Sequence, residues 1–121
     1  MALEYVRARW RAVGYAGAGI GELVRTQANA RIHLAVTAVV VGMGCALRVT
    51  AQDWCWLIAA MGAVWVAEAL NTAVEMLADA ACPEFHPLVR RAKDVAAGAV
   101  LLAAIAAMGI GVCVLGGRIF Q

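Results

Sequence analysis

Four polar residues recur along one otherwise apolar segment of the sequence. They are Glu68, Asn71, Glu75 and Asp79, and the steps between them are three, four and four residues. Because an α-helix turns about once every 3.6 residues, this spacing places all four on one helix face. Carboxylate and amide oxygens in such a row can hold Mg²⁺, and one carboxylate can accept the proton of a hydroxyl group. Ionisable groups inside an apolar span are costly, so we expect this face to line a protein interior or a wet cavity.

Two further polar groups stand at the starts of neighbouring apolar segments. Lys93 and Asp94 precede the last segment, and Asn29, Arg31 and His33 open the first. A lysine can neutralise phosphate, and carboxylates can hold the metal of a nucleotide complex. All three groups are expected at one membrane level. Together they suit a metal–nucleotide complex that meets a hydroxyl-bearing lipid at the lipid–water boundary.

Each of these residues also has a plainer interpretation. Glu68 and Asn71 could join neighbouring helices, as polar residues do inside membranes. Asp79 could be a helix-end residue that faces water, and Lys93 could be an ordinary interfacial cation. His33 at the start of a helix is better explained by interfacial packing. Only the polar stripe combined with the lysine at the same depth favours chemistry.

Three apolar segments must position these residues. The chain is 64% hydrophobic and only 15% charged, with a mean hydropathy of +0.81, which is too apolar for a surface that faces water. Segments long enough to cross a bilayer occupy residues 29–49, 54–78 and 95–115. They predict an all-α membrane protein with three transmembrane helices. Residues 79–94 are expected to form a polar linker between the last two.

The N-terminal residues 1–28 are predicted to form an amphipathic surface helix followed by a bend. Trp10 and other apolar residues recur at helical spacing, while arginines occupy other positions. This pattern is typical of a helix that lies in the headgroup plane of an anionic leaflet. Glycines recur between residues 14 and 21, and we expect the helix to bend or break there.

The distribution of basic residues predicts the orientation of the chain. Eight of the ten Lys and Arg residues fall on the side of the N-terminus and the second linker, and two fall on the opposite side. By the positive-inside rule the N-terminus should be cytoplasmic and the C-terminus external.

Three sequence runs resemble the prokaryotic diacylglycerol kinase family, which includes the undecaprenol kinases. The runs are N-A-R-I-H at 29–33, E-A-L-N-T-A-V-E at 68–75 and A-K-D-V-A-A-G-A-V at 92–100. The resemblance covers nearly the whole chain and implies a single membrane lipid kinase domain over residues 1–121. It implies a homotrimer in the bacterial inner (cytoplasmic) membrane, without a nucleic-acid partner. The implied activity uses ATP and Mg²⁺ to phosphorylate the hydroxyl of undecaprenol or diacylglycerol.

The resemblance also implies roles for individual residues. Glu68 would be the general base, and Asn71 would position the reacting groups. Gln27 stands where the family often has a metal-binding glutamate, and Glu75 would be a metal ligand. The implied nucleotide-binding residues are Lys93, Asp94, Glu75, Asp79, Glu84 and His86. The residues expected to bind the lipid are Asn29, Arg31 and Trp65.

Two other functions compete with this interpretation. Subunits of small multidrug-type transporters have a similar length and an intramembrane glutamate, but they have four spans with the carboxylate in the first. Here three spans are predicted, with the carboxylates in the second, which counts against a transporter. A catalytically silent member of the family is the other alternative, and only Gln27 points to it.

Overall fold

The computed structural model describes all 121 residues, and all of its regular secondary structure is helical. Three helices are long and apolar enough to cross a membrane, so the predicted all-α fold with three spans is confirmed. The helices are α1 (Ala2–Thr26), α2 (Ala28–Ala46), α3 (Ala51–Ala81) and α4 (Pro87–Gly111), which continues through the π-helical η1 (Val112–Gly116) into the short α5 (Gly117–Ile119).

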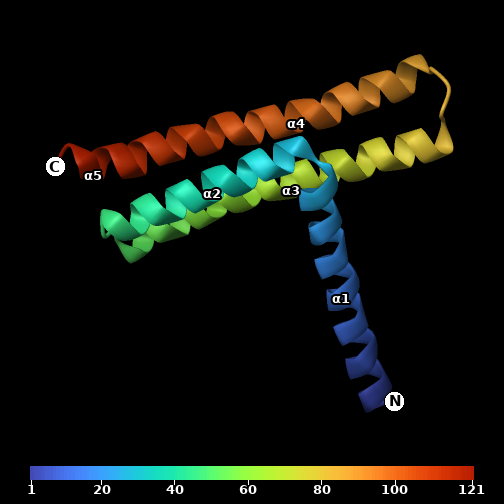
Figure 1. The fold of residues 1–121 in the computed structure, drawn as a ribbon, viewed down its shortest axis with the longest axis horizontal. Helices are drawn as coiled ribbons and strands as arrows, with labels where there is room; N and C mark the ends of the chain where they lie inside the picture. The colour runs from blue at the N-terminus through green and yellow to red at the C-terminus, as the bar shows by residue number, and fades with distance from the viewer.

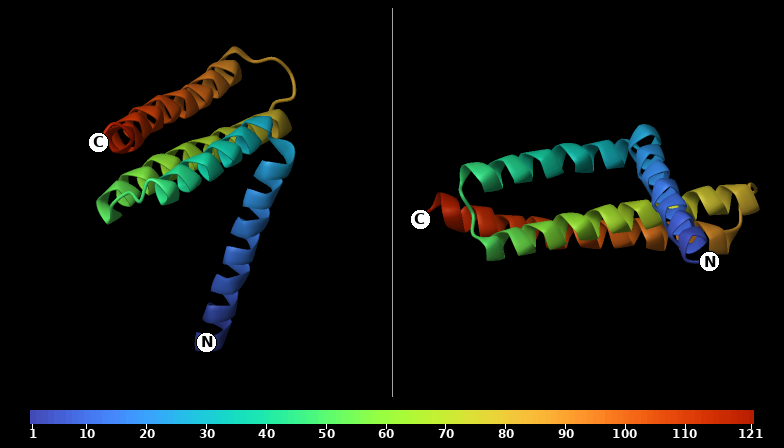
Figure 2. Two further views of the ribbon diagram at one scale, coloured as in Figure 1. Left: turned by 60° about the vertical axis from the view of Figure 1, so that its left-hand side comes forward. Right: turned by 90° about the horizontal axis from the view of Figure 1, so that it is seen from below.

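The spanning helices run side by side, and α1 stands apart from them. Helix α4 packs along α3 over most of its length, while α2 packs on α3 less extensively (Figures 1 and 2). The α3–α4 loop lies at one end of the bundle, which we call the loop end. The α2–α3 turn and the C-terminus lie at the opposite end, which we call the turn end. Helix α1 leaves the bundle at a steep angle from the α1–α2 junction (Figure 1).

A compact turn connects α2 to α3. The Arg48 N–H donates to the Cys45 carbonyl and the Val49 N–H donates to the Gly44 carbonyl, both at 3.2 Å. This pair of bonds is a Schellman motif, which uses carbonyls that the helix end leaves free. Arg48 has a φ of 51°, the left-handed conformation that glycine usually supplies at this position.

An ion pair then ties the start of α3 to the end of the chain. Thr50 and Asp53 form a capping box, in which each side chain accepts the other residue's backbone N–H at 3.1 Å. Arg118 donates from Nε and Nη2 to the Oδ2 atom of Asp53, at 3.1 and 2.8 Å. The cluster of Val49, Leu57 and Leu115 packs at the same end. The turn end is therefore where the three spanning helices are held together.

The isolated chain has very little core of its own. Only 11 of its 121 residues are buried, and large apolar side chains along α2, α3 and α4 remain exposed. A water-soluble protein of this size rarely exposes so much contiguous apolar surface. The exposed faces are therefore suited to lipid acyl chains and to neighbouring membrane helices.

Most of the polar linker predicted over residues 79–94 is helical. Helix α3 continues to Ala81 and α4 begins at Pro87, so only residues 82–86 connect them. The reason is local: Nδ1 of His86 caps α4 by accepting the Leu88 N–H at 3.2 Å, and proline is well suited to the first turn. The charged residues of this segment are thus held on rigid helices.

The predicted bend between residues 14 and 21 is also absent. Helix α1 is continuous to Thr26, and the break falls at Gln27, which has the extended conformation φ −100° and ψ 121°. Glycine lowers the stability of a helix, but its N–H and C=O groups still form the helical hydrogen bonds. A run of glycines therefore does not by itself end a helix. At the break, Nη1 of Arg31 donates to the free carbonyl of Arg25 at 2.9 Å and supports the corner.

Candidate active site

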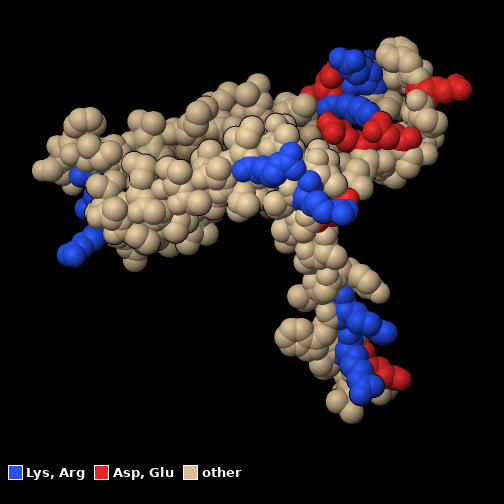
Figure 3. Space-filling view, viewed as in Figure 1, with Lys and Arg blue, Asp and Glu red and all other residues tan.

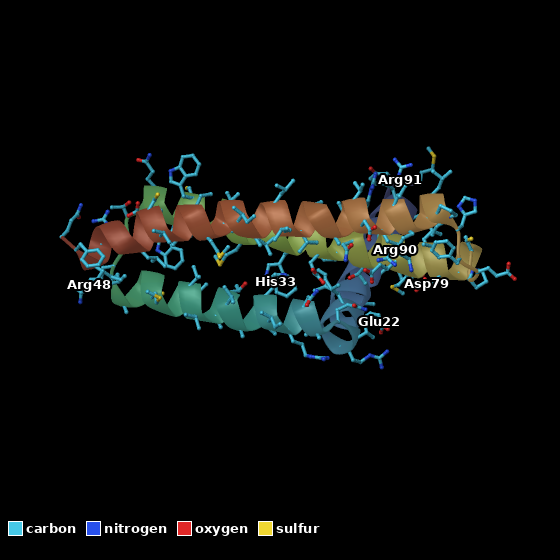
Figure 4. All side chains as sticks on the ribbon, turned by 90° about the horizontal axis from the view of Figure 1, so that it is seen from above. Glu22, His33, Arg48, Asp79, Arg90 and Arg91 are labelled. Atoms are coloured by element: carbon cyan, nitrogen blue, oxygen red, sulfur yellow. The ribbon has the colours of Figure 1, made fainter.

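A polar pocket of about 270 Å³ lies between α2, α3 and α4, with Glu68 at its wall. Glu68 is only 1% exposed, and its Oε2 atom is enclosed without a hydrogen-bond partner. The nearest group that can carry a positive charge is Nε2 of His33, at 3.6 Å from Oε2. Figure 4 shows His33 between α2 and the α3–α4 pair. An enclosed carboxylate oxygen without a partner is costly, which marks this pocket as a site for chemistry.

The polar row continues along α3 toward the loop end. Nδ2 of Asn71 donates to Oε1 of Glu75 at 3.4 Å, while Oδ1 of Asn71 is buried without a partner. Glu68 and Asn71 both line the polar pocket, and Glu75 follows one turn further along the helix. The amide of Asn71 therefore connects the buried region around Glu68 to the more accessible carboxylate of Glu75.

An ion pair across α3 and α4 extends the row. Nζ of Lys93 lies 2.5 Å from Oδ1 of Asp79, with the lysine side chain 30% exposed. Asp94 instead pairs with Arg90 on the exposed side of α4, with Oδ1 and Nε 3.2 Å apart. In Figure 4, Asp79 and Arg90 both lie toward the loop end. Lys93 and Asp94 are neighbours in sequence, but the structure pairs them with different residues.

The remaining predicted site residues lie away from this row. His86 caps α4, and the backbone carbonyl of Glu84 accepts a hydrogen bond from the Cys82 thiol at 3.5 Å, so both belong to the loop. Gln27 occupies the α1–α2 break, where its Nε2 donates to the Thr26 hydroxyl at 3.1 Å. No hydrogen bond or ion pair joins Gln27, Arg31, Glu84 or His86 to the row on α3.

A larger, apolar cavity of about 630 Å³ adjoins the polar pocket. Ile32, His33 and Ala104 line both spaces, so these three residues mark where the two adjoin. Trp65 lines the apolar cavity, and its Nε1 donates to the Thr37 hydroxyl at 3.0 Å. Asn29 lines the polar pocket. Two of the three residues predicted to bind lipid therefore line these spaces, while Arg31 is exposed and binds the α1–α2 corner.

His33 and Thr37 are the residues that the sequence interpretation undervalued. His33 was assigned mainly to packing, and Thr37 was not singled out. A signal for both was present, because Asn29, His33 and Thr37 follow one another at steps of four residues and share one face of α2.

The oxygen donors of the α3 row suit a hard cation whose remaining ligands are water and substrate oxygens. The structure contains no cluster of three or more His, Cys, Asp and Glu side chains that could form a closed metal cage. Mg²⁺ needs no such cage, since it usually binds through one or two carboxylates together with water and substrate phosphates. Glu75, with the orphaned amide oxygen of Asn71 beside it, fits that requirement.

On the face shown in Figure 3, charged side chains gather at the loop end and along α1, with a few basic ones at the turn end, and the surface between the two ends of the bundle is largely uncharged. The fold and the site thus define a multi-pass membrane protein with a buried carboxylate in a pocket that adjoins an apolar cavity. The family model for "Prokaryotic diacylglycerol kinase" matches residues 14–115, and the chain belongs to this family.

Individual relatives agree with the family match. The undecaprenol kinase of Bacillus subtilis is 35% identical over 100 residues, which cover 83% of this chain and 81% of that protein. The diacylglycerol kinase of Escherichia coli K12 is 34% identical over 98 residues, covering 81% and 80%. A Synechocystis diacylglycerol kinase is 41% identical over 102 residues, which cover 84% of this chain and 58% of that protein. The protein is a lipid kinase, and the transporter alternative is not favoured.

Proposed function

We propose that this protein transfers the γ-phosphoryl group of ATP, with Mg²⁺, to the hydroxyl of undecaprenol or diacylglycerol. The observation that carries the proposal is Glu68, a buried carboxylate on the wall of a polar pocket that adjoins an apolar cavity. A lipid acceptor needs this arrangement, because its hydroxyl must reach a base while its hydrocarbon stays out of water.

The transfer forms one bond, breaks one bond and moves one proton. The acceptor oxygen forms a bond to the γ-phosphorus while the bond from that phosphorus to the ADP oxygen breaks. The hydroxyl proton passes to the carboxylate of Glu68, and bulk water takes it up after the products leave. Asn71 holds the reacting groups in place, since its amide lies one turn from the base.

The charges toward the loop end suit the nucleotide. Lys93 can exchange Asp79 for phosphate oxygens, and Asp94, Asp79, Glu84 and His86 would surround the nucleotide. Mg²⁺, held by Glu75 and by the carbonyl oxygen of Gln27, would neutralise charge on the phosphates. Gln27 can approach Glu75 only through a change at the α1–α2 corner or from another subunit.

The acceptor's hydrocarbon would occupy the apolar cavity beside Trp65. Asn29 at the pocket wall and Arg31 at the α1–α2 corner would bind the polar end of the lipid. The N-A-R-I-H and N-T-A-V-E runs favour undecaprenol slightly over diacylglycerol.

We place the protein in the bacterial inner membrane as one lipid kinase domain that assembles into a homotrimer. The N-terminus and the loop end face the cytoplasm, where ATP is available, and α1 lies on the membrane surface. The exposed alanine- and glycine-rich faces of α4 support assembly, because small residues allow membrane helices to pack closely. Light scattering of the purified protein in detergent tests the subunit number.

The decisive experiment supplies ATP, Mg²⁺ and either lipid in mixed micelles to the purified protein. Both the wild type and Glu4→Gln, a change on the exposed arm of α1, should phosphorylate at least one lipid. Glu68→Gln should lower kcat by about 10²-fold or more, as expected for loss of a general base. Phosphate transfer to neither lipid by the wild type would refute the proposal.

A further inference from the structure

His33 is the only ionisable side chain that lies within ion-pair range of the buried carboxylate of Glu68. Its side chain is 18% exposed, and its Nε2 lies 3.6 Å from Oε2 of Glu68. That separation is slightly longer than a hydrogen bond but within ion-pair range, so a small approach would close it. The sequence contains two histidines, and the other one, His86, caps α4 at the loop end.

No other charged group faces Glu68 from the surrounding helices. The pocket lining contains no lysine or arginine, and α4 contributes only apolar side chains to it, namely Ala97, Val100, Leu101 and Ala104. From α2 the polar residues are Asn29 and His33, and from α3 the other polar residue of the lining is Asn71. The contact with His33 is thus the only ion-pair contact of Glu68.

The two carboxylate oxygens of Glu68 have different surroundings. Oε2 is enclosed and faces His33, whereas Oε1 is not among the enclosed atoms. If Nε2–H holds Oε2, the carboxylate cannot rotate freely, and Oε1 remains directed at the space the acceptor would enter. His33 also lines both the polar pocket and the apolar cavity, which places it at the junction between them.

We propose that His33 is a positioning residue for Glu68, and that its Nε2–H orients the carboxylate toward the lipid hydroxyl. The proposal rests on the lipid kinase function set out above. His33 gains and loses no proton during the transfer. Its effect is to hold the base in a productive geometry, where a displacement of about 1 Å can cost roughly 10²-fold in rate.

The test compares variants that remove or keep the N–H donor. His33→Leu and His33→Met remove it, and each should lower kcat for the lipid by about 10- to 100-fold, with the KM for ATP within about twofold of wild type. His33→Gln keeps an N–H donor and should stay within about threefold of the wild-type kcat. Val39→Ala, at an exposed position on the same helix, is the matched control and should not change kcat.

A second measurement separates positioning from a general effect on folding. In a Glu68→Gln background there is no carboxylate charge to hold, so His33→Met should cause no further loss of residual rate. His33→Met should also lower Tm more in the wild-type background than in the Glu68→Gln background. Only in the wild-type background does the substitution leave the buried Glu68 carboxylate without its ion-pair partner.

The outcomes distinguish the two proposals. An active wild type whose His33→Leu and His33→Met variants keep full kcat refutes the role of His33 and leaves the kinase function standing. Equal losses in His33→Gln and His33→Met, or equal losses with and without Glu68, also refute the role of His33. A wild type that phosphorylates neither lipid refutes the kinase proposal and the role of His33 with it.

Discussion

The contact between Gly44 and Trp54 allows a quantitative test of how α2 and α3 are held together. A Cβ atom added at Gly44 would lie 2.7 Å from Cη2 and 2.9 Å from Cζ2 of Trp54. Carbon atoms normally approach to about 3.5–4.0 Å, so the indole ring would have to move by about 1 Å. Gly42 lies two residues earlier on the same helix, and a Cβ there would meet nothing within 4 Å.

We expect Gly44→Ala to destabilise the protein and Gly42→Ala to stabilise it. Alanine is favoured over glycine in a helix by about 1 kcal/mol at both positions, so this term cancels when the two variants are compared. The remaining difference is the overpacking at Trp54, about 1–3 kcal/mol. Gly44→Ala should therefore unfold at a Tm lower than Gly42→Ala by about 4 °C or more.

The measurement is thermal unfolding of the two variants in the same detergent, followed by circular dichroism. Trp54→Phe removes part of the indole and should reduce the difference between the two glycine variants. Phosphate transfer below the transition should stay within about threefold of wild type, because Gly44 lies about 16 Å along α2 from His33. Equal Tm values for the two alanine variants would refute the close approach of α2 and α3 at Gly44.

Three further predictions concern the turn, the nucleotide charges and the metal. Arg48→Gly should raise the free energy of unfolding by about 1 kcal/mol, because it relieves the left-handed conformation at φ 51°; an unchanged denaturation midpoint, or an equal gain in Arg48→Ala, would contradict this. Lys93→Met should lower kcat by about 10²-fold or more, whereas Asp79→Asn, which frees the lysine, should cost less; steady-state kinetics with varied ATP would show the order, and a reversed order would exclude phosphate binding by the lysine. Gln27→Glu should keep or raise activity at low Mg²⁺, because it adds a charged ligand; if the variant needed a higher Mg²⁺ concentration than the wild type for half-maximal activity, Gln27 would not face the metal.

The sequence predicts most of what lies on a single helix and little of what lies between helices. The shared face of Glu68, Asn71 and Glu75 follows directly from helical periodicity. The contact of Glu68 with His33 does not, because it depends on how the α2–α3 turn sets the register of two helices. That register depends on the left-handed Arg48, a conformation that no local sequence rule assigns to arginine.

The segment 79–94 shows a different limit of sequence interpretation. The segment is polar, as a linker would be, but alanine has the highest helix propensity and a proline is tolerated in the first turn of a helix. His86 is the N-cap of α4, and Pro87 is its first residue. Charge here indicates that the helices have left the hydrocarbon layer, not that they have ended.

The length of α3 supports the proposed placement of the polar row, in which the row crosses the membrane boundary instead of lying along it. With Trp56 as the exposed aromatic anchor at the turn end, Glu68 lies about 18 Å further along the helix at 1.5 Å per residue. Glu75 then lies about 29 Å and Asp79 about 35 Å from the anchor, on the same scale. A hydrocarbon layer about 30 Å thick places Glu68 inside it, Glu75 at its edge and Asp79 in water. With the proposed roles, one rigid helix would present a base to a lipid hydroxyl and metal and phosphate ligands to a nucleotide, and residue spacing would set the distance between the two substrates. Moving Glu68 toward the loop end by one turn would bring it closer to the nucleotide groups but take it away from both the apolar cavity and His33.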